Sequence, residues 1–531
     1  MAGGCLCAPC DAIAREAPAA GESEPVSRAA TLVQLASRLL SSLQDGSMSE
    51  TAYDTAWIAR VPDPNNRTQR AFPSAIDWLL RHQHADGSWG GQLEIVHDRV
   101  VSTLAAVLAL VESPSARSGR AVQAGIAYLA RSVPRIDDDF VETVGFELIM
   151  PPLLAQARRL GLPLPATAAS SIERLRADKL QRLPAAFAYS GLTSLTHSLE
   201  FLGEDLQPDL VRRWRASNGS YGASPSATAY VLMHQWDAAG AAYLRAVLDL
   251  SSVGGACNVF PFEIFERTWV LYSLGPLAKR VAAHRSVVAR LAADWSRVGV
   301  GFTREGVGPD GDDTAMAFQV LDDYALLPPS SGVLRLFEAD DHFFCLALER
   351  NPSVSTNAHF LEALNAARDH IDRDRLIHKA LQFLASCRVD DRYWRDKWHV
   401  SPYYATSRAI RALAGLEQQG QHLSATAVAW LLETQHANGS WSELESDGTC
   451  EETAHALLAL TCLPRPDERI LGAVRRGARY LWQHFDDQDH PELWVGKGLY
   501  TPHAVVRAVI LGALYAAERT LGPAPSSSRG A

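Results

Sequence analysis

The sequence predicts an all-α protein that contains two α/α-barrel domains. Three observations favour this fold class: apolar residues recur at helical spacing along most of the chain, strand-like alternation is scarce, and one helical unit is repeated. The chain has 531 residues, of which 47% are hydrophobic and 21% are charged. A chain of this length and composition can bury the cores of two large domains.

The predicted helices follow from apolar residues that lie three or four positions apart and are separated by Gly and Pro. The clearest examples span residues 31–43, 100–111, 246–250, 456–463 and 504–518. Several of these segments are rich in Ala and Thr. Because small side chains let helix axes approach one another, such helices suit the inner layer of a barrel.

An internal repeat organises the helices. Members that begin at Gln83, Ala216 and Gln435 each have an Asp/Asn-Gly-Ser-aromatic turn, a polar linker and a helix rich in Thr or Ala. Residues 308–321 fit the same frame, because DDTAMAF aligns with EETAHAL of the third member. Repeated units of this kind stack, and a closed stack gathers the N-termini of its inner helices around a cavity. The members form an early and a late group, which predicts two barrels, and we expect helix 31–43 to join the second.

Charge and cysteine content exclude several classes of protein. The net charge is −10 and no block of five basic residues occurs, so we expect a small-molecule partner and no nucleic acid. No apolar run reaches the roughly 18 residues of a transmembrane helix, and the N-terminus lacks the features of a signal peptide, which predicts a cytoplasmic protein. We expect Cys5, Cys7 and Cys10 to be incidental residues of an unstructured leader.

Three acids precede a predicted apolar helix: Asp310, Asp312 and Asp313. Carboxylates this close together cannot all ionise cheaply, and burial raises their pKa values further, so in a dry cavity the cluster would hold a proton at neutral pH and act as a Brønsted acid. The simpler alternative is that Asp310 and Asp312 only cap the helix. The helix that follows has no Lys or Arg to neutralise three acids, which favours the catalytic interpretation.

The segment DGDDTA (310–315) fits the Asp-x-Asp-Asp motif of class II terpene cyclases, and the chain resembles the copalyl diphosphate synthases over nearly its whole length. Further motifs follow in the family's order: SETAYDTAWIARV (49–61), QHADGSWG (83–90), VHDRVVSTLAAVLAL (96–110), VGFELIMPPLL (144–154), SLTHSLEFL (194–202), NGSYGASPSATA (218–229), NVFPFEIFERTW (258–269) and DKWHVSPYY (396–404).

The resemblance implies two barrels named β and γ, with γ inserted after the first helix of β and the active site between them. The predicted segments are a flexible N-terminal tail (1–26), the first β helix (27–48), the γ domain (49–275), the rest of the β domain (276–520) and a flexible C-terminal tail (521–531).

The resemblance also implies a reaction. Asp312 would be the general acid, tuned by Asp310 and Asp313, and would protonate the terminal alkene of geranylgeranyl diphosphate to begin a cyclisation that retains the diphosphate. His197 and Asn258 match a pair that holds a water for the final deprotonation, which suggests ent-copalyl diphosphate as the product.

The same resemblance gives the groups that would hold the diphosphate. Lys179 and Lys397 match its lysine ligands, and Glu147 matches the acid that helps to hold Mg²⁺. Candidates to line the cavity with aromatic rings are Phe262, Trp269, Trp398, Tyr403 and Tyr404. The stretches near Asp340 and Asp486 do not meet the class I Asp-Asp-x-x-Asp pattern, so a downstream class I terpene synthase is the expected pathway partner.

Four alternatives stay open from the sequence. Within the fold, the substrate could be farnesyl diphosphate with a drimenyl product, or the product another labdane or halimane diphosphate. An α/α-toroid glycoside hydrolase would place two acids on separate loops. A protein prenyltransferase subunit would bind Zn²⁺, for which Asp447, Cys450 and His455 are the candidates. A non-catalytic helical scaffold would have no use for three clustered acids.

Overall fold

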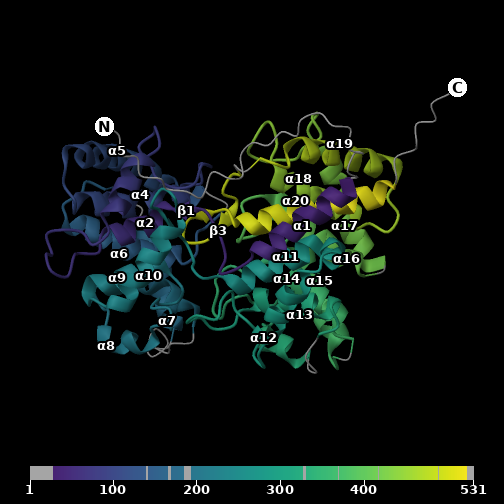
Figure 1. Cartoon of the computed structure of the whole chain (residues 1–531), viewed down its shortest axis with the longest axis horizontal. Coiled ribbons are helices and arrows are strands. Elements are labelled where there is room, and N and C mark those ends of the chain that lie inside the picture. The colour runs from purple at the N-terminus through teal and green to yellow at the C-terminus, as the bar shows by residue number, and fades with distance from the viewer. Residues whose placement is uncertain are drawn as a thin grey trace, which may run out of the picture.

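The computed structural model describes residues 28–138, 141–164, 169–183, 193–326, 331–368, 370–416, 418–487 and 490–522. Two helical lobes lie side by side (Figure 1). Strands in the described part of the chain are limited to two short antiparallel pairs, β1 (Glu50–Thr51) with β2 (Ala256–Cys257) and β3 (Trp494–Val495) with β4 (Leu499–Tyr500). The predicted all-α class with α/α-barrel architecture is confirmed. Cys5, Cys7, Cys10 and nearly all of both predicted tails lie outside the described residues.

The first lobe follows the chain from β1 to β2. Five of its elements form a closed ring in which α2 contacts α4, α4 contacts α6, α6 contacts η3, η3 contacts α9, and α9 returns to α2. The elements are α2 (Ala52–Ala59), α3 (Pro73–Arg81), α4 (Val96–Val111), α5 (Ala116–Ser132), η1 (Val133–Asp138), α6 (Phe146–Arg159), α7 (Ala169–Arg182), η3 (Ser194–Leu202), α8 (Pro208–Val211), η4 (Arg212–Trp214), α9 (Pro225–His234) and α10 (Ala238–Leu250).

The second lobe closes in the same way, with α11, α13, α14, α16, α18 and α20 each in contact with the next and α20 in contact with α11. Its elements are α1 (Arg28–Ser42), α11 (Glu263–Leu274), η5 (Gly275–Arg280), α12 (His284–Asp294), α13 (Gly311–Asp323), η6 (Ser331–Phe337), α14 (Val354–Ala366), α15 (Arg373–Ser386), α16 (Pro402–Ala414), α17 (Gln418–Glu433), α18 (Cys450–Thr461), α19 (Glu468–His484) and α20 (His503–Leu521).

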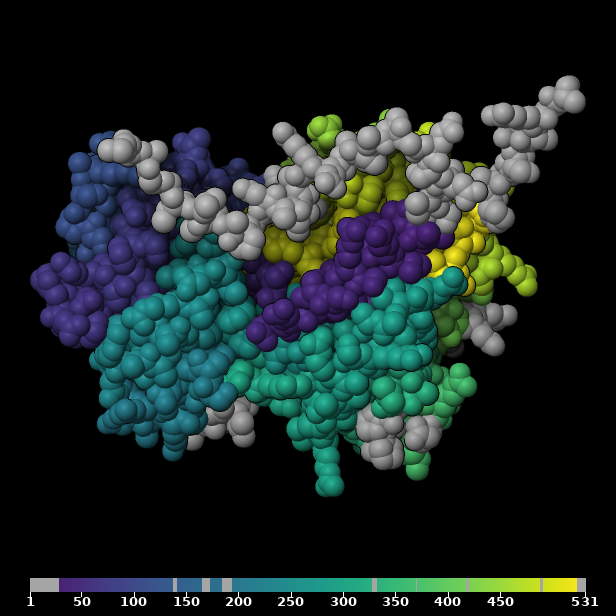
Figure 2. All heavy atoms as spheres, viewed as in Figure 1, coloured from purple at the N-terminus to yellow at the C-terminus, as the bar shows by residue number. Residues whose placement is uncertain are grey.

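The N-terminal helix α1 belongs to the second lobe. It lies along α20 on the surface of that lobe (Figure 2), and it buries Leu32, Ala36 and Leu40 in the same core as α20. The buried residues of α11 also belong to the hydrophobic core of the second lobe, whereas the core of the first lobe ends at Cys257. The boundary between the two cores therefore lies before α11. The domain boundary at 275/276 that we expect from the sequence stays a prediction.

The aromatic residue of the repeated turn forms hydrogen bonds to the outer helix before it and the inner helix after it. The indole N–H of Trp441 donates to the carbonyl of Leu431 at 2.8 Å, and its backbone N–H donates to the Thr453 hydroxyl of the next inner helix at 2.9 Å. Trp89 and Trp394 make the equivalent bonds. The aromatic residue and the helical Thr therefore join each outer helix to the inner helix that follows.

The β3–β4 hairpin of the second lobe reaches into the first. At its tip, the fully buried ammonium of Lys497 donates to the carbonyl of His197 at 2.8 Å, to Glu200 Oε1 at 2.9 Å and to Ser224 Oγ at 2.7 Å. These bonds fix the two barrels against each other at the face where the candidate site lies. Among the described helices, none is both long enough and apolar enough to cross a membrane.

Candidate active site

The three predicted acids meet on the wall of one cavity at the N-terminus of α13. Asp310 is the N-cap of this helix, and its Oδ1 accepts the backbone N–H of Asp313 at 2.8 Å. Asp310, Asp312 and Asp313 are all buried, and all three line a cavity of about 150 Å³ between the lobes. Asp310 is thus a helix cap as well as a cavity residue.

Burial gives this cluster its acid character. It raises the pKa of Asp310 to about 7, against the hydrogen bonds from Asp313 and with help from the charge of Asp312. Burial, followed by the charge of Asp310, raises the pKa of Asp313 well above its ordinary value. Both shifts favour the protonated forms of Asp310 and Asp313 near neutral pH, the direction expected for buried acids that lie close together.

His359, a residue that was not predicted from the sequence, is hydrogen-bonded to Asp312, the predicted general acid. Its Nδ1 lies 2.7 Å from Asp312 Oδ1, and the imidazole is fully buried on the neighbouring inner helix α14. With the proton on Nδ1, His359 donates to Oδ1, which leaves Oδ2 of Asp312 to carry the acidic proton. The internal repeat could have indicated this residue, because His359 and His455 occupy the same repeat position, six residues after the N-cap of their helices.

Aromatic rings form a large part of the remaining wall of the 150 Å³ cavity. The lining rings are Phe262, Phe265, Phe302, Trp398, Tyr404, Trp494 and Tyr500. Two sequence candidates are not among them. Trp269 lies one layer behind and stacks on Phe265 at 4.1 Å, and Tyr403 stacks on Trp430 at 4.9 Å, because successive residues of an inner helix point to different sides of the barrel wall.

His197 and Asn258 line the same cavity as the three acids. His197 Nδ1 lies 2.9 Å from the carbonyl of Gly222, to which it donates, so Nε2 keeps a free lone pair. Burial and then the Lys497 charge lower the pKa of His197 to about 3, which keeps the imidazole neutral. Asn258 Nδ2 donates to Asp54 Oδ2 at 2.8 Å, so its amide oxygen is the free end.

Asp54 is a second residue that sequence reasoning missed, although it lies within SETAYDTAW. Its carboxylate is fully buried and accepts hydrogen bonds from Thr51, Ser226 and Asn258. It thereby fixes the orientation of the Asn258 amide toward the cavity. Burial raises its pKa, although the Lys497 charge and these hydrogen bonds oppose the shift.

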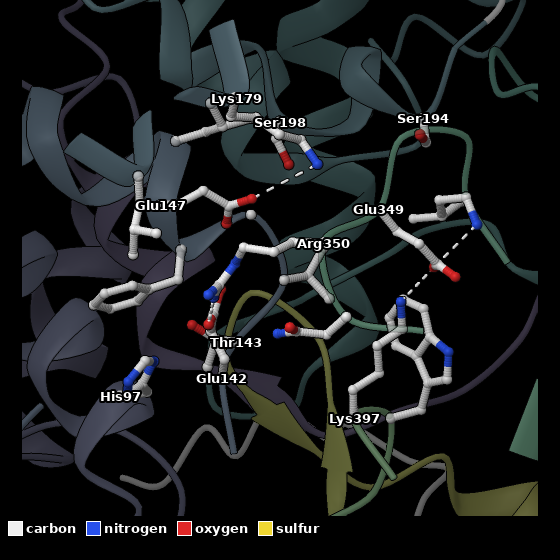
Figure 3. A pocket seen from close by; sticks show the side chains of 18 of the residues that line it. His97, Glu142, Thr143, Glu147, Lys179, Ser194, Ser198, Glu349, Arg350 and Lys397 are labelled. Carbon is white, nitrogen blue, oxygen red and sulfur yellow. Dashed lines mark hydrogen bonds and ion pairs between the residues drawn. The ribbon is translucent and has the colours of Figure 1, made fainter. Parts of the chain in front are cut away.

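A second cavity of about 530 Å³ contains the predicted diphosphate ligands (Figure 3). Lys179 Nζ lies 3.7 Å from Glu147 Oε1, and Lys397 pairs with Glu349. Arg350, which pairs with Glu142, lies between these two pairs in the view of Figure 3. Burial lowers the pKa of Lys179. The cavity thus offers several cations whose present partners are carboxylates.

The two cavities adjoin. Val144, Ser194, Ser198, Leu346 and Trp398 line both of them. An elongated molecule can therefore place an anionic head among Lys179 and Lys397 and an apolar tail against the acids.

The second cavity contains carboxylates, the kind of ligand that a magnesium ion takes. Glu147 is buried at the start of α6, close to Lys179, and two further carboxylates, Glu142 and Glu349, line the same cavity. Mg²⁺ prefers oxygen ligands and commonly takes one or two carboxylates together with phosphate oxygens and water. The three acids do not form a close ligand group by themselves, so a magnesium ion here would need Glu147 together with oxygens of a bound substrate and water.

The zinc alternative does not match the geometry. Cys450 donates to the carbonyl of His484 at 3.5 Å, and His455 lies instead with His399 and Glu451. Among the described residues, these three form the single group whose ligand atoms are all close enough to hold a metal ion.

Comparison with known proteins places the chain in a family. Residues 344–501 match the family model of the squalene-hopene cyclase C-terminal domain. The type B diterpene cyclase of Mycobacterium tuberculosis is 34% identical over 88% of this chain and 95% of its own. The ent-copalyl diphosphate synthase of Streptomyces sp. KO-3988 is 35% identical over 89% of this chain and 93% of its own. The chain belongs to the class II diterpene cyclases.

The fold of this diterpene cyclase agrees with that of a solved relative. The ent-copalyl diphosphate synthase of Streptomyces platensis superposes with a TM-score of 0.73 at 28% identity and covers 92% of this chain and 99% of its own. The protein is thus an enzyme of the intramolecular lyase and isomerase type. The glycoside hydrolase, prenyltransferase and scaffold alternatives are wrong, because these relatives match both barrels.

The cyclase should lose activity as the pH rises through about 7. Asp310, whose pKa is raised to about 7, becomes anionic above that pH, so the cluster loses a proton and gains a negative charge within the cavity. We therefore expect kcat to be highest below pH 7 and to fall above it. Steady-state rates between pH 5.5 and 9 measure the effect. Asp310→Asn keeps a helix-capping side chain and should lack this inflection; an unchanged profile would contradict the assignment.

Proposed function

We propose that this class II diterpene cyclase converts geranylgeranyl diphosphate into a bicyclic diphosphate of the copalyl type, in the ent series, with the diphosphate retained. The observation that carries the proposal is the cluster of protonated, buried aspartates on an aromatic wall, next to a cavity rich in cations. The names of the relatives support the same reaction.

In the proposed mechanism Asp312 provides the proton. Its O–H bond breaks as the proton joins the terminal alkene, and the resulting tertiary cation is attacked in turn by the neighbouring double bonds, which closes two rings. An alkene is a poor base, so the reaction needs a proton donor held directly against the alkene and away from water. The His359 N–H stabilises the Asp312 carboxylate that remains.

His197 and Asn258 end the reaction in this proposal. The neutral Nε2 of His197 and the free amide oxygen of Asn258 can hold a water that takes a proton from the bicyclic cation. The C–H bond that breaks supplies the electrons of the new double bond, so substrate and product are isomers. The tautomer of His197 and the orientation of Asn258, set by Gly222 and Asp54, suit this acceptor role.

Lys179 and Lys397 would bind the diphosphate, together with Arg350 of the same cavity. Glu147 would hold Mg²⁺, with Glu142 and Glu349 as neighbouring carboxylates, and the ion would neutralise charge on the diphosphate oxygens when bound. Because the diphosphate stays attached, the product would be a substrate for a class I terpene synthase. We place the enzyme in the cytoplasm on the basis of its sequence.

Incubation of the purified enzyme with geranylgeranyl and farnesyl diphosphates, in separate reactions, tests the proposal. Phosphatase treatment and chiral gas chromatography of the alcohols should give ent-copalol from the first substrate. A drimenyl alcohol from the second substrate alone, or a halimane skeleton, would identify a different cyclase of the same fold. A hydrocarbon released without phosphatase would contradict retention of the diphosphate.

Replacement of Lys179 or Lys397 by alanine should weaken binding of the diphosphate. Each change removes one charge-assisted contact, so we expect KM to rise by about tenfold with a smaller effect on kcat. Inorganic pyrophosphate should also become a weaker competitive inhibitor of both variants. Lys279→Ala, which changes an exposed lysine of the second lobe, is the matched control. Unchanged inhibition by pyrophosphate would exclude these lysines from the site.

Removal of divalent ions should slow the reaction. Chelation should lower turnover and added Mg²⁺ should restore it, because the anionic head group then lacks its counter-ion. Glu147→Gln should require a higher Mg²⁺ concentration for half-maximal turnover. A titration of initial rate against Mg²⁺ measures both effects, and identical titrations for the two enzymes would argue against Glu147 as a ligand.

A further inference from the structure

A second buried carboxylate occupies the repeat position of the general acid. Glu451 is the second residue of α18, as Asp312 is the second residue of α13. Both face a histidine: Asp312 lies 2.7 Å from His359 Nδ1, and Glu451 Oε1 lies 3.3 Å from His399 Nε2. Glu451 is fully buried, and the proposed mechanism does not use it.

The surroundings of Glu451 do not suit a metal ion. The backbone N–H of Ser401 donates to His399 Nδ1 at 3.1 Å, so the ring proton of neutral His399 is on Nε2. His399 therefore donates to Glu451 and has no lone pair there for a metal. The indole N–H of Trp494 donates to the same oxygen, Glu451 Oε1, at 2.7 Å.

The contacts of Glu451 favour its ionised form. Burial opposes its ionisation, yet the contacts with His399 and His455 hold the pKa of Glu451 well below its ordinary value. Burial lowers the pKa of His455 to about 4, so this neighbour is neutral. Glu451 Oε2 has no hydrogen-bond partner among the described residues. A buried ionised carboxylate is stable only where a positive charge or hydrogen-bond donors lie close to it. Here the donors are the N–H groups of His399 and Trp494.

Trp494 connects this carboxylate to the cavity. Its ring lines the 150 Å³ cavity together with Asp312 and Tyr404, while its N–H points to Glu451. The rings of Trp494 and Tyr404 lie 5.2 Å apart in an edge-to-face arrangement. An N–H group that donates to an anion pushes electron density into the indole, and an indole richer in electrons attracts a cation at its face more strongly.

We propose that Glu451 is a positioning residue of the cyclisation, whose buried carboxylate acts through Trp494 to stabilise the carbocation in the cavity. The inference rests on the proposed cyclisation, because it needs a cationic intermediate. Glu451 does not touch the substrate in this account, since the indole of Trp494 lies between them. Asp312 generates the carbocation by protonating the alkene, and Glu451 lowers the free energy of that cation in the cavity.

Binding of a charged mimic tests this inference apart from turnover. The probes are an analogue of geranylgeranyl diphosphate in which a protonated tertiary amine replaces the terminal tertiary carbon, and its neutral carbon counterpart. We expect Glu451→Gln to weaken binding of the amine by about tenfold, and of the neutral analogue by less than twofold. A merely structural role would weaken both equally, and that result would overturn the inference.

Glu452→Gln is the matched control. Glu452 is the next residue of α18 and is 2% exposed, but its oxygens accept the backbone N–H of Glu443 and the Thr449 hydroxyl, away from Trp494. This variant should bind both analogues as the wild type does. A selective loss of the amine in Glu452→Gln would show a general effect of charge in the barrel and contradict a specific role of Glu451.

Trp494→Phe keeps an aromatic ring but removes the N–H. It should show the same selective loss, and Glu451→Gln should add little in its background. If Glu451→Gln does not fold, Trp494→Phe decides alone, and wild-type binding of the amine would overturn the inference. A wild-type enzyme that turns over no prenyl diphosphate would contradict the proposed function instead. Normal turnover with an equal loss of both analogues in Glu451→Gln contradicts this inference only.

Discussion

Replacement of Asp312 by asparagine is expected to abolish cyclisation, with a fall in kcat of roughly 10² to 10⁴-fold or more, the range for loss of a positioned general acid. The amide keeps the size of the side chain and can accept from His359 Nδ1, which lies 2.7 Å from Asp312 Oδ1 in the native enzyme. It has no acidic proton to give to an alkene. Gas chromatography of phosphatase-treated products measures the loss.

The control for this change lies on the same helix. Asp323→Asn alters an exposed carboxylate at the other end of α13, so turnover should stay close to that of the wild type. Circular dichroism and thermal unfolding should show both variants folded. Substantial turnover by Asp312→Asn would transfer the role of acid to Asp310 or Asp313, and the proposed mechanism would then be wrong.

The sequence predicts the barrels because each sequence repeat corresponds to one structural unit. The turn that contains Trp441 and the hydroxyl of Thr453 form one hydrogen-bonded unit, and the chain repeats that unit where a new inner helix begins. Gly439 in this turn has a φ of +96°, and a Cβ there would meet the carbonyl oxygen of Arg476 at 2.6 Å. The geometry of the turn therefore requires Gly at position 439, and the hydrogen bonds of Trp441 favour Trp at position 441. For this reason the NGSW pattern can be recognised from the sequence alone.

The cluster of Asp310, Asp312 and Asp313 is also local, since three neighbouring residues at one helix end must share one environment. The partners of these acids are not local. His359 is 47 positions from Asp312, and its position follows only when α13 and α14 become neighbours in the ring. Asp54 and Asn258 are 204 positions apart, and no spacing rule connects them.

Aromatic residues show a related difficulty. Tyr403 and Tyr404 are consecutive, yet Tyr404 lines the cavity and Tyr403 does not. Composition and periodicity place both on an inner helix, but the direction of each side chain depends on how α16 is rotated within the barrel. That rotation is set by packing against α14 and α18, which the sequence does not state directly.

Replacement of Lys497 by methionine is the change that we expect to destabilise the fold most. Lys497 and Glu200 are both fully buried and form an ion pair at 2.9 Å across the two lobes. Methionine fits the space but leaves the Glu200 carboxylate uncompensated in a dry interior, which typically costs about 3–5 kcal/mol. The midpoint of urea unfolding should fall accordingly, and Lys279→Met, at an exposed site, should leave it nearly unchanged.

A second substitution separates lost charge balance from lost packing. Glu200→Gln combined with Lys497→Met removes both charges, so most of the lost stability should return if the unpaired carboxylate is the cause. Because Lys497 also donates to the carbonyl of His197 at 2.8 Å, the double variant should fold but hold the proposed terminal base less firmly. It should therefore release more product in which water, rather than proton loss, ends the reaction. A double variant as unstable as Lys497→Met would show that the hydrogen bonds to Ser224 and His197, rather than the ion pair, hold the lobes together.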